Sequence, residues 1–103
     1  MQRLKKHIDE VNNREYYIFF CPACGHPHLI YTSGAGVPYW RFNGDVDNPT
    51  FEPSLRNTWS YNNKERQCHL NIENGIIIFH GDSTHNLKNT RVPLVDWDGF
   101  ESL

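Results

Sequence analysis

Gln67-Cys68-His69-Leu70-Asn71-Ile72-Glu73-Asn74-Gly75-Ile76-Ile77-Ile78-Phe79-His80-Gly81 is the stretch that decides the fold of this chain. An Asn-Gly pair between two apolar runs is the strongest short signal of a two-residue β-hairpin turn. A turn at Asn74 and Gly75 fixes the register, so that one face carries the opposed pairs Glu73 with Ile76, Asn71 with Ile78 and His69 with His80. The other face is apolar and consists of Cys68, Leu70, Ile72, Ile77 and Phe79. We therefore expect this second face to belong to the core.

This register separates two neighbours that both look like metal ligands. Successive side chains of a strand leave opposite faces of the sheet, so Cys68 and His69 cannot easily bind one ion. We expect Cys68 to point into the core and His69 to point away from it. A bulge near Gln67 would re-aim one of the two side chains.

A second informative motif is Cys21-Pro22-Ala23-Cys24-Gly25, which holds two thiols two residues apart. Pro22 and Gly25 help the chain to turn back on itself, as a Zn²⁺ knuckle requires. Structural zinc takes four Cys or His ligands in a tetrahedron. The predicted zinc ligands are Cys21, Cys24, Cys68 and His85. The main alternative replaces Cys68 by His69 and leaves a free thiol in the core. A redox pair or a disulfide scaffold fits the chain less well, because there is no strand-helix-strand pattern and the cysteine count is odd.

The rest of the chain has the rhythm of a small all-β domain, or a β-rich α+β domain with little helix, in which hairpins surround a zinc knuckle. Lys6 to Val11 and Glu15 to Phe20 read as a hairpin, with a short helix through Leu4, Ile8 and Val11 as the alternative. Further strands are expected at 28–32, 39–42, 54–61 and 91–95, with a possible helical turn at 84–87. Asn48 to Ser54 contains two prolines and is expected to be an ordered loop.

Length, composition and net charge exclude several classes of protein. With 103 residues, 38% of them hydrophobic, the chain is expected to be a single domain over residues 1–103 with an acidic tail at 96–103. A net charge of −2 argues against a nucleic-acid-binding protein. There is no apolar run that would cross a bilayer or act as a secretion signal. We therefore expect a cytoplasmic protein that acts without nucleic acid or membrane.

Together the motifs resemble a small family of phage and bacterial proteins of unknown function. Members are often mislabelled "ammonia monooxygenase", and some are encoded beside bacterial ubiquitin-like conjugation genes. The matching residues span about 17 to 95 and comprise Cys21-Pro22-Ala23-Cys24-Gly25 with His28, Trp40 to Asp45, Pro49 to Ser54, Cys68-His69, Gly75 to Phe79, and Asp82 to Leu87. The resemblance implies a zinc-binding fold and a peptidase that processes or removes a ubiquitin-like protein. Ser83 departs from the family, where cysteine is frequent, as does His80, where an apolar residue is common.

Three residues outside the predicted zinc site suggest chemistry. Ser54, His69 and Asp82 supply the nucleophile, general base and orienting carboxylate of a serine hydrolase. Taken singly, they also fit a turn hydroxyl, a solvated histidine and a helix N-cap. A second enzyme hypothesis places an open zinc on His69, Asp82 and His85, with Glu52 as general base.

A non-enzymatic hypothesis also remains. A structural zinc module can bind a protein partner, such as a host defence protein disabled by a phage factor. Exposed aromatic side chains at Tyr39, Trp59 or Trp97 would suit such an interface. The protein partner is thus either a ubiquitin-like protein or a host defence protein, and the sequence leaves the oligomeric state open.

Overall fold

The structure is a computed structural model that describes residues 3–34, 36 and 38–99. Its elements are the strands β1 (Lys5–Asp9), β2 (Arg14–Cys21), β3 (His26–Ser33), β4 (Arg41–Phe42), β5 (Phe51–Tyr61), β6 (Lys64–Glu73), β7 (Ile76–Phe79) and β8 (Arg91–Pro93). The described residues contain no α-helix. The prediction of a nearly all-β domain is therefore confirmed.

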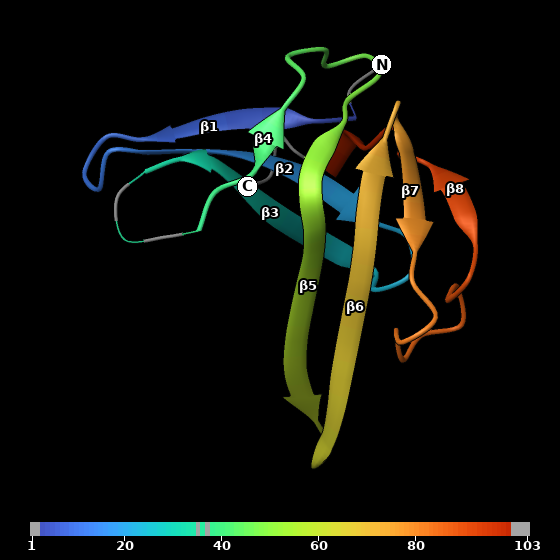
Figure 1. Ribbon diagram of the computed structural model, residues 1–103. Coiled ribbons are helices and arrows are strands. Elements are labelled where there is room, and N and C mark those ends of the chain that lie inside the picture. The colour runs from blue at the N-terminus through green and yellow to red at the C-terminus, as the bar shows by residue number, and fades with distance from the viewer. Residues whose placement is uncertain (1–2, 35, 37, 100–103) are drawn as a thin grey trace.

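The strands form two antiparallel sheets, one with the order β1-β2-β3 and one with the order β4-β5-β6-β7-β8. In Figure 1 the strands of the first sheet run across those of the second, behind β5 and β6. Residues of both sheets share one core, which contains Tyr17, Phe19, Cys21 and Ile30 from the first sheet and Phe51, Leu55, Cys68, Leu70, Ile72, Ile77, Phe79 and Leu94 from the second sheet and its C-terminal end. Each sheet thus buries one face and leaves the other accessible.

The hairpin of β6 and β7 has the register that the sequence predicts. Glu73 pairs with Ile76, and Asn71 pairs with Ile78. The turn residues Asn74 and Gly75 both have positive φ, at 49° and 77°, as a type I′ turn requires. His80 continues the register beyond the strand, because its N–H donates to the carbonyl oxygen of His69 over 2.8 Å.

The N-terminal hairpin is also confirmed, since β1 and β2 pair from Lys5 with Ile18 to Asp9 with Arg14. The alternative of a short helix there is wrong. β4 is shorter than expected, and β8 ends at Pro93. The predicted tail at 96–103 extends into residues 100–103, which lie outside the described residues.

The expectation of a loop from Asn48 to Ser54 is wrong for its second half. β5 begins at Phe51 and runs through Pro53, with β4 on one side and β6 on the other. A register shift between Phe51 and Leu55 accommodates Pro53. Because the regular ladder is interrupted there, the N–H that proline lacks is not needed for a hydrogen bond. The strand therefore reaches the core at Phe51, bulges, and presents Ser54 at the end of the bulge, just before regular pairing resumes at Leu55.

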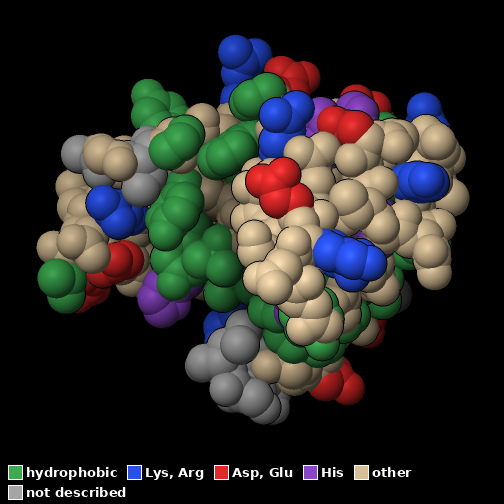
Figure 2. Space-filling view, turned by 90° about the horizontal axis from the view of Figure 1, so that it is seen from below, with side chains coloured by type: hydrophobic (Ala, Val, Ile, Leu, Met, Phe, Trp, Pro, Cys, Tyr) green, Lys and Arg blue, Asp and Glu red, His purple; other side chains and the backbone are tan. Residues whose placement is uncertain are grey.

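The outer surface is uneven in polarity. Figure 2, seen from below, shows hydrophobic side chains gathered in a band to one side of the view, with polar side chains and backbone over most of the rest. Large apolar side chains that are exposed include Leu29, Tyr39 and Tyr61. No helix among the described residues is long and apolar enough to cross a membrane.

Candidate functional site

Two groups of reactive side chains lie on opposite faces of β6. Cys68 is fully buried between the sheets, whereas His69 points to the outer face, where its side chain is 16% exposed. Alternation along the strand is the cause, because Leu70 and Cys68 face the core and His69 lies between them.

On the outer face, Ser54, His69 and Asp82 form a continuous chain of hydrogen bonds. Ser54 Oγ lies 3.0 Å from His69 Nε2. His69 Nδ1 lies 3.0 Å from Asp82 Oδ1 and 3.1 Å from Asp82 Oδ2. A carboxylate only accepts, so Nδ1 carries the proton, and Nε2 of the neutral ring accepts the hydroxyl hydrogen of Ser54. The sequence predicts these three residues as a set, and the structure brings them together.

Backbone pairing positions each of the three. Ser54 lies at the end of the bulge of β5, His69 lies on β6, and Asp82 lies in the loop that leaves β7. That loop is fastened to β6, because the N–H of Thr84 donates to the carbonyl oxygen of Gln67 over 2.9 Å and the Gln67 side-chain amide donates to the carbonyl oxygen of Asp82 over 3.0 Å. The carboxylate is thus held beside the imidazole rather than used as a helix cap.

Ser83 fixes the backbone of the central histidine. Its hydroxyl accepts from the N–H of His69 over 3.0 Å and donates to the carbonyl oxygen of His69 over 3.2 Å. Ser83 is itself buried, with 4% exposure. Ser83 therefore holds the backbone of His69 in place through two hydrogen bonds.

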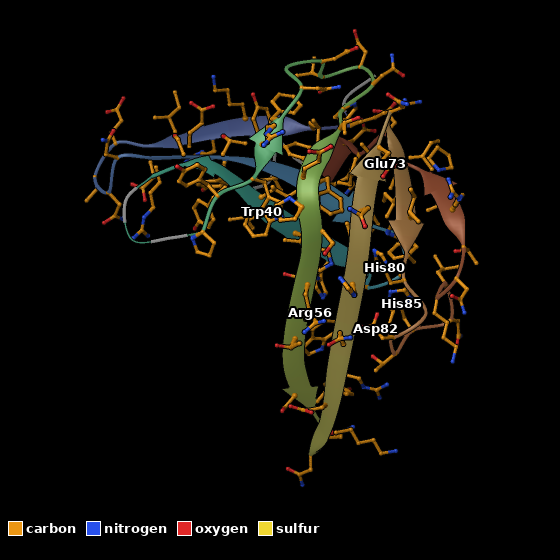
Figure 3. The ribbon with its side chains drawn as sticks, in the orientation of Figure 1. Trp40, Arg56, Glu73, His80, Asp82 and His85 are labelled. Atoms are coloured by element: carbon orange, nitrogen blue, oxygen red, sulfur yellow. The ribbon has the colours of Figure 1, made fainter. Side chains whose placement is uncertain are left out.

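The charge on Asp82 is stabilised by its neighbours. The hydrogen bond from His69 lowers the pKa of Asp82 below its usual range, and Arg56 adds a smaller effect in the same direction. Arg56 Nη2 lies 3.9 Å from Asp82 Oδ2, and both side chains are about half exposed, so this ion pair is weak. Figure 3 shows Arg56, His80 and Asp82 around β5 and β6, with Trp40 on the other side of β5.

His80 covers one face of the His69 ring. The two ring centroids are 4.2 Å apart and the planes are inclined by 22°, which is a stacked arrangement. His80 Nε2 lies 2.6 Å from Asn71 Oδ1, so the amide holds the covering ring in place. The predicted register places His80 opposite His69, but the sequence does not predict that the two rings stack.

Between the sheets lies the second group, Cys21, Cys24, His28 and Cys68. One ligand atom from each of these residues lies within 4.8 Å of the others. Cys21 Sγ and Cys68 Sγ are 3.9 Å apart, close to the edge of about 3.8 Å expected for a tetrahedron with 2.3 Å zinc–sulfur bonds. His28 is 4% exposed, and its Nε2 is buried with no hydrogen-bond partner. An imidazole nitrogen and three thiols in this arrangement fit a bound metal ion.

The thiols already perturb one another strongly. Hydrogen bonds from Cys24 and Cys68 hold the pKa of Cys21 far below its usual range. Donation to Cys21 raises the pKa of Cys24 to about 12 and also raises that of Cys68. Three thiols this close cannot all ionise without a counter-charge, so a bound cation would favour their thiolate forms.

The fourth member of this cluster differs from the expected one. His28 occupies the place for which the sequence analysis named His85, because His28 lies on β3 directly after the knuckle and faces inward. His85 lies nearby: its ring packs edge-on against Phe79, its Nδ1 accepts from the N–H of Leu87, and burial lowers its pKa. His28 stands four residues after Cys24 in the sequence, and this short spacing is a signal that could have identified it as a ligand.

The alternative of an open metal site is not assembled. Among the described residues, the one group of ligand atoms close enough for a metal is the inner cluster, and it does not contain His69, Asp82 or His85. Both nitrogens of His69 are used by Ser54 and Asp82. Glu52, the expected base, instead lies 3.6 Å from Arg41.

A groove of about 870 Å³ lies beside the candidate nucleophile, lined among others by Tyr39, Trp40, Glu52 and Pro53. The Trp40 indole N–H donates to the carbonyl oxygen of Ser54 over 3.1 Å. The groove thus adjoins the backbone of Ser54 and is large enough to hold part of a peptide.

Comparison with protein families gives one match, to the bacterial ubiquitination-like system serine proteases (BubE), over residues 2–80. This range contains Ser54, His69 and the whole Cys/His cluster, but it ends before Asp82, which rests on the geometry alone. No curated protein and no solved structure matches the chain. Because the match covers most of the sequence, this chain belongs to the BubE family of bacterial ubiquitination-like system serine proteases.

Proposed function

We propose that this protein is a serine hydrolase that cleaves the acyl bond at the end of a ubiquitin-like protein, and so processes that protein or removes it from a conjugate. The observation that carries the proposal is the pair of 3.0 Å contacts from Ser54 Oγ to His69 Nε2 and from His69 Nδ1 to Asp82. The family name supports the same reaction class and supplies the substrate class.

The reaction follows from the roles of the three side chains. His69 Nε2 takes the proton of Ser54 while Oγ attacks the carbonyl carbon of the substrate. Asp82 holds the Nδ1 proton and stabilises the imidazolium that forms. His69 then gives the proton to the leaving amine or alcohol, and an acyl-enzyme with Ser54 remains. Water, deprotonated by His69, releases the acid and restores the hydroxyl.

The metal of the inner cluster is proposed to be Zn²⁺ with a structural role. Three thiolates and an imidazole fill a four-coordinate site, which leaves no open position for substrate. Residues Cys21 and Cys68 belong to different sheets, so a bound ion would join the two halves of the core. Such a site needs reduced thiols, which favours the cytoplasm as the compartment.

An activity-based probe tests the hydrolase without knowledge of the natural substrate. A fluorophosphonate reacts with serines activated by a neighbouring base, so we expect it to label Ser54. The Ser54→Ala protein should not be labelled, whereas Ser33→Ala, which removes an exposed serine of β3, should be labelled like the wild type. Labelling of Ser54→Ala at the wild-type level would exclude the serine mechanism.

The substrate class needs a second experiment. The protein is incubated with peptide-linked and ester-linked conjugates of a ubiquitin-like protein, with and without a chelator. Cleavage of either bond that is lost in Ser54→Ala is the expected result. Absence of cleavage in every condition would favour the non-enzymatic module that binds a protein partner.

A further inference from the structure

β5 has an edge without a strand partner that begins just after the candidate nucleophile, whose own carbonyl oxygen accepts from the Trp40 indole N–H. β4 pairs only with Phe51 and Glu52 of β5, through Phe42 and Arg41. Beyond Glu52, no strand in residues 3–34, 36 and 38–99 pairs with that side of β5, whereas β6 pairs with the other side as far as Tyr61. Figure 1 shows the lower half of β5 beside β6 with no ribbon along its other side.

The ladder shows which backbone groups face this edge. Gln67 and His69 direct their carbonyl groups away from β5, toward Thr84 and His80. Cys68 and Leu70 therefore direct their N–H and C=O groups toward β5, where their register partners are Asn57 and Leu55. By alternation, the N–H and C=O groups of Arg56, Thr58 and Ser60 point to the free edge.

Nothing in the sequence of this edge prevents pairing. Proteins protect edge strands with proline, inward charges or bulges, and here Pro53 and the bulge both lie before Leu55. From Ser54 to Tyr61 the single charged residue is Arg56. Arg56, Thr58 and Ser60 are exposed, so their backbone is accessible.

We propose that the free edge of β5 binds the extended tail of the substrate as an added β-strand, which leads its scissile carbonyl to Ser54. This inference rests on the proposed function. From Leu55 to Ser60 the edge is about 17 Å long, so it pairs with about five extended residues. Recognition is mainly through the peptide backbone, and it therefore accepts tails of varied sequence.

The position of Ser54 distinguishes this occupant from a second copy of the chain. The free edge and the candidate nucleophile lie on the same strand, so a peptide paired along Arg56, Thr58 and Ser60 would end beside Ser54. The groove lined by Tyr39, Trp40 and Glu52 lies on the other side of Ser54 along β5. In this proposal it binds the leaving group of the substrate. The two places together give an extended substrate a path across the nucleophile.

The test compares two esters in each protein: an acetylated glycine ethyl ester, and the same ester extended by five residues. In the wild type, the extension should raise kcat/KM by about tenfold or more, the effect of two or more hydrogen bonds. Thr58→Pro removes an N–H that β6 does not use, and should abolish this gain. Thr58→Ala, its matched control, keeps the N–H and should keep the gain. A gain that survives in Thr58→Pro, or no gain in the wild type, would overturn the proposal.

Modified probes test the edge without changing the protein, in case Thr58→Pro does not fold. Two sets of alternate amides in the long ester are N-methylated separately. One set faces β5 and should lose the gain, while the other faces away and should retain it. Equal effects of the two sets would contradict strand addition.

Binding separates this inference from the hydrolase proposal. In Ser54→Ala, the unesterified long peptide should shift the amide resonances of Arg56, Thr58 and Ser60 in a heteronuclear NMR spectrum. These shifts test the edge even if Ser54→Ala proves still active, which would refute only the proposed function. A homodimer that is lost in Thr58→Pro would assign the edge to self-association and overturn the inference.

Discussion

The inner and outer faces of β6 carry two sites that differ in almost every physical property. The inner cluster is buried apart from Cys24, which is half-buried, and it holds three sulfurs within reach of one ion. The outer triad is partly exposed, depends on a loop for one member, and adjoins a groove. Cys68 and His69 are neighbours in sequence, so strand alternation alone separates the two environments. Burial gives the first site its stability, and accessibility gives the second its chemistry.

The largest expected effect comes from removing a ligand of the inner cluster. His28→Ala or Cys68→Ser should lose the bound metal, about one ion per chain, and with it the cooperative folding transition, because structural zinc supplies folding free energy. Metal analysis and thermal unfolding measure both quantities. His85→Ala is the matched control and should keep its metal. Loss of metal in His85→Ala with retention in His28→Ala would reverse the assignment of the fourth ligand.

The next largest effect should appear on the outer face, and only in activity. Asp82→Asn removes the carboxylate that selects the tautomer of His69, so kcat should fall by about 10²- to 10⁴-fold. Metal content and the far-ultraviolet circular dichroism spectrum should not change. A kcat within twofold of the wild type would show that Asp82 has no part in the reaction.

A smaller effect is expected at His80, which packs on the ring of His69, the proposed general base. His80→Ala should lower kcat by about two- to tenfold with little change in KM, since one stacked ring pair contributes modestly. His80→Phe retains an aromatic face and should restore most of the loss. If both variants match the wild type, the stack has no role in positioning His69.

The smallest effect concerns acid stability. Because hydrogen bonding to His69 lowers the pKa of Asp82 in the folded chain, Asp82 contributes stability above its usual pKa of 3.8. This contribution is lost as the pH falls through the lowered folded-state pKa. The difference in thermal midpoint between wild type and Asp82→Asn should therefore be constant near neutral pH and narrow only as the pH falls below 3.8. A difference independent of pH would contradict this linkage.

The outer site could be predicted from the sequence because it depends on a local turn and on strand alternation. The Asn74-Gly75 turn sets the register of β6 and β7, and that register places His69 on the accessible face. The start of β5 at Phe51 could not be predicted from the sequence, because the bulge that accommodates Pro53 depends on pairing with two neighbouring strands. The turn at Asn62 and Asn63, with φ of 52° and 62°, was not predicted, because it contains no glycine and is followed by charged residues.

The fourth inner residue was missed for a different reason. His28 and His85 are both buried or half-buried histidines near the thiols, and only the packing of the two sheets selects between them. Distances between sheets are tertiary information that strand alternation does not contain. The contacts of Ser83 and His80 with His69 likewise depend on tertiary packing and could not be predicted from strand alternation.

The neighbouring positions of Cys68 and His69 also limit how this protein can diverge. A single-residue insertion within the paired part of β6 would turn the thiol outward and the imidazole inward, and would disable both sites at once. Changes of length should therefore accumulate at the Asn62-Asn63 turn, beyond the last paired residues Tyr61 and Lys64. Descendants of this fold are expected to inherit the metal cluster and the hydrolytic residues together or to lose them together.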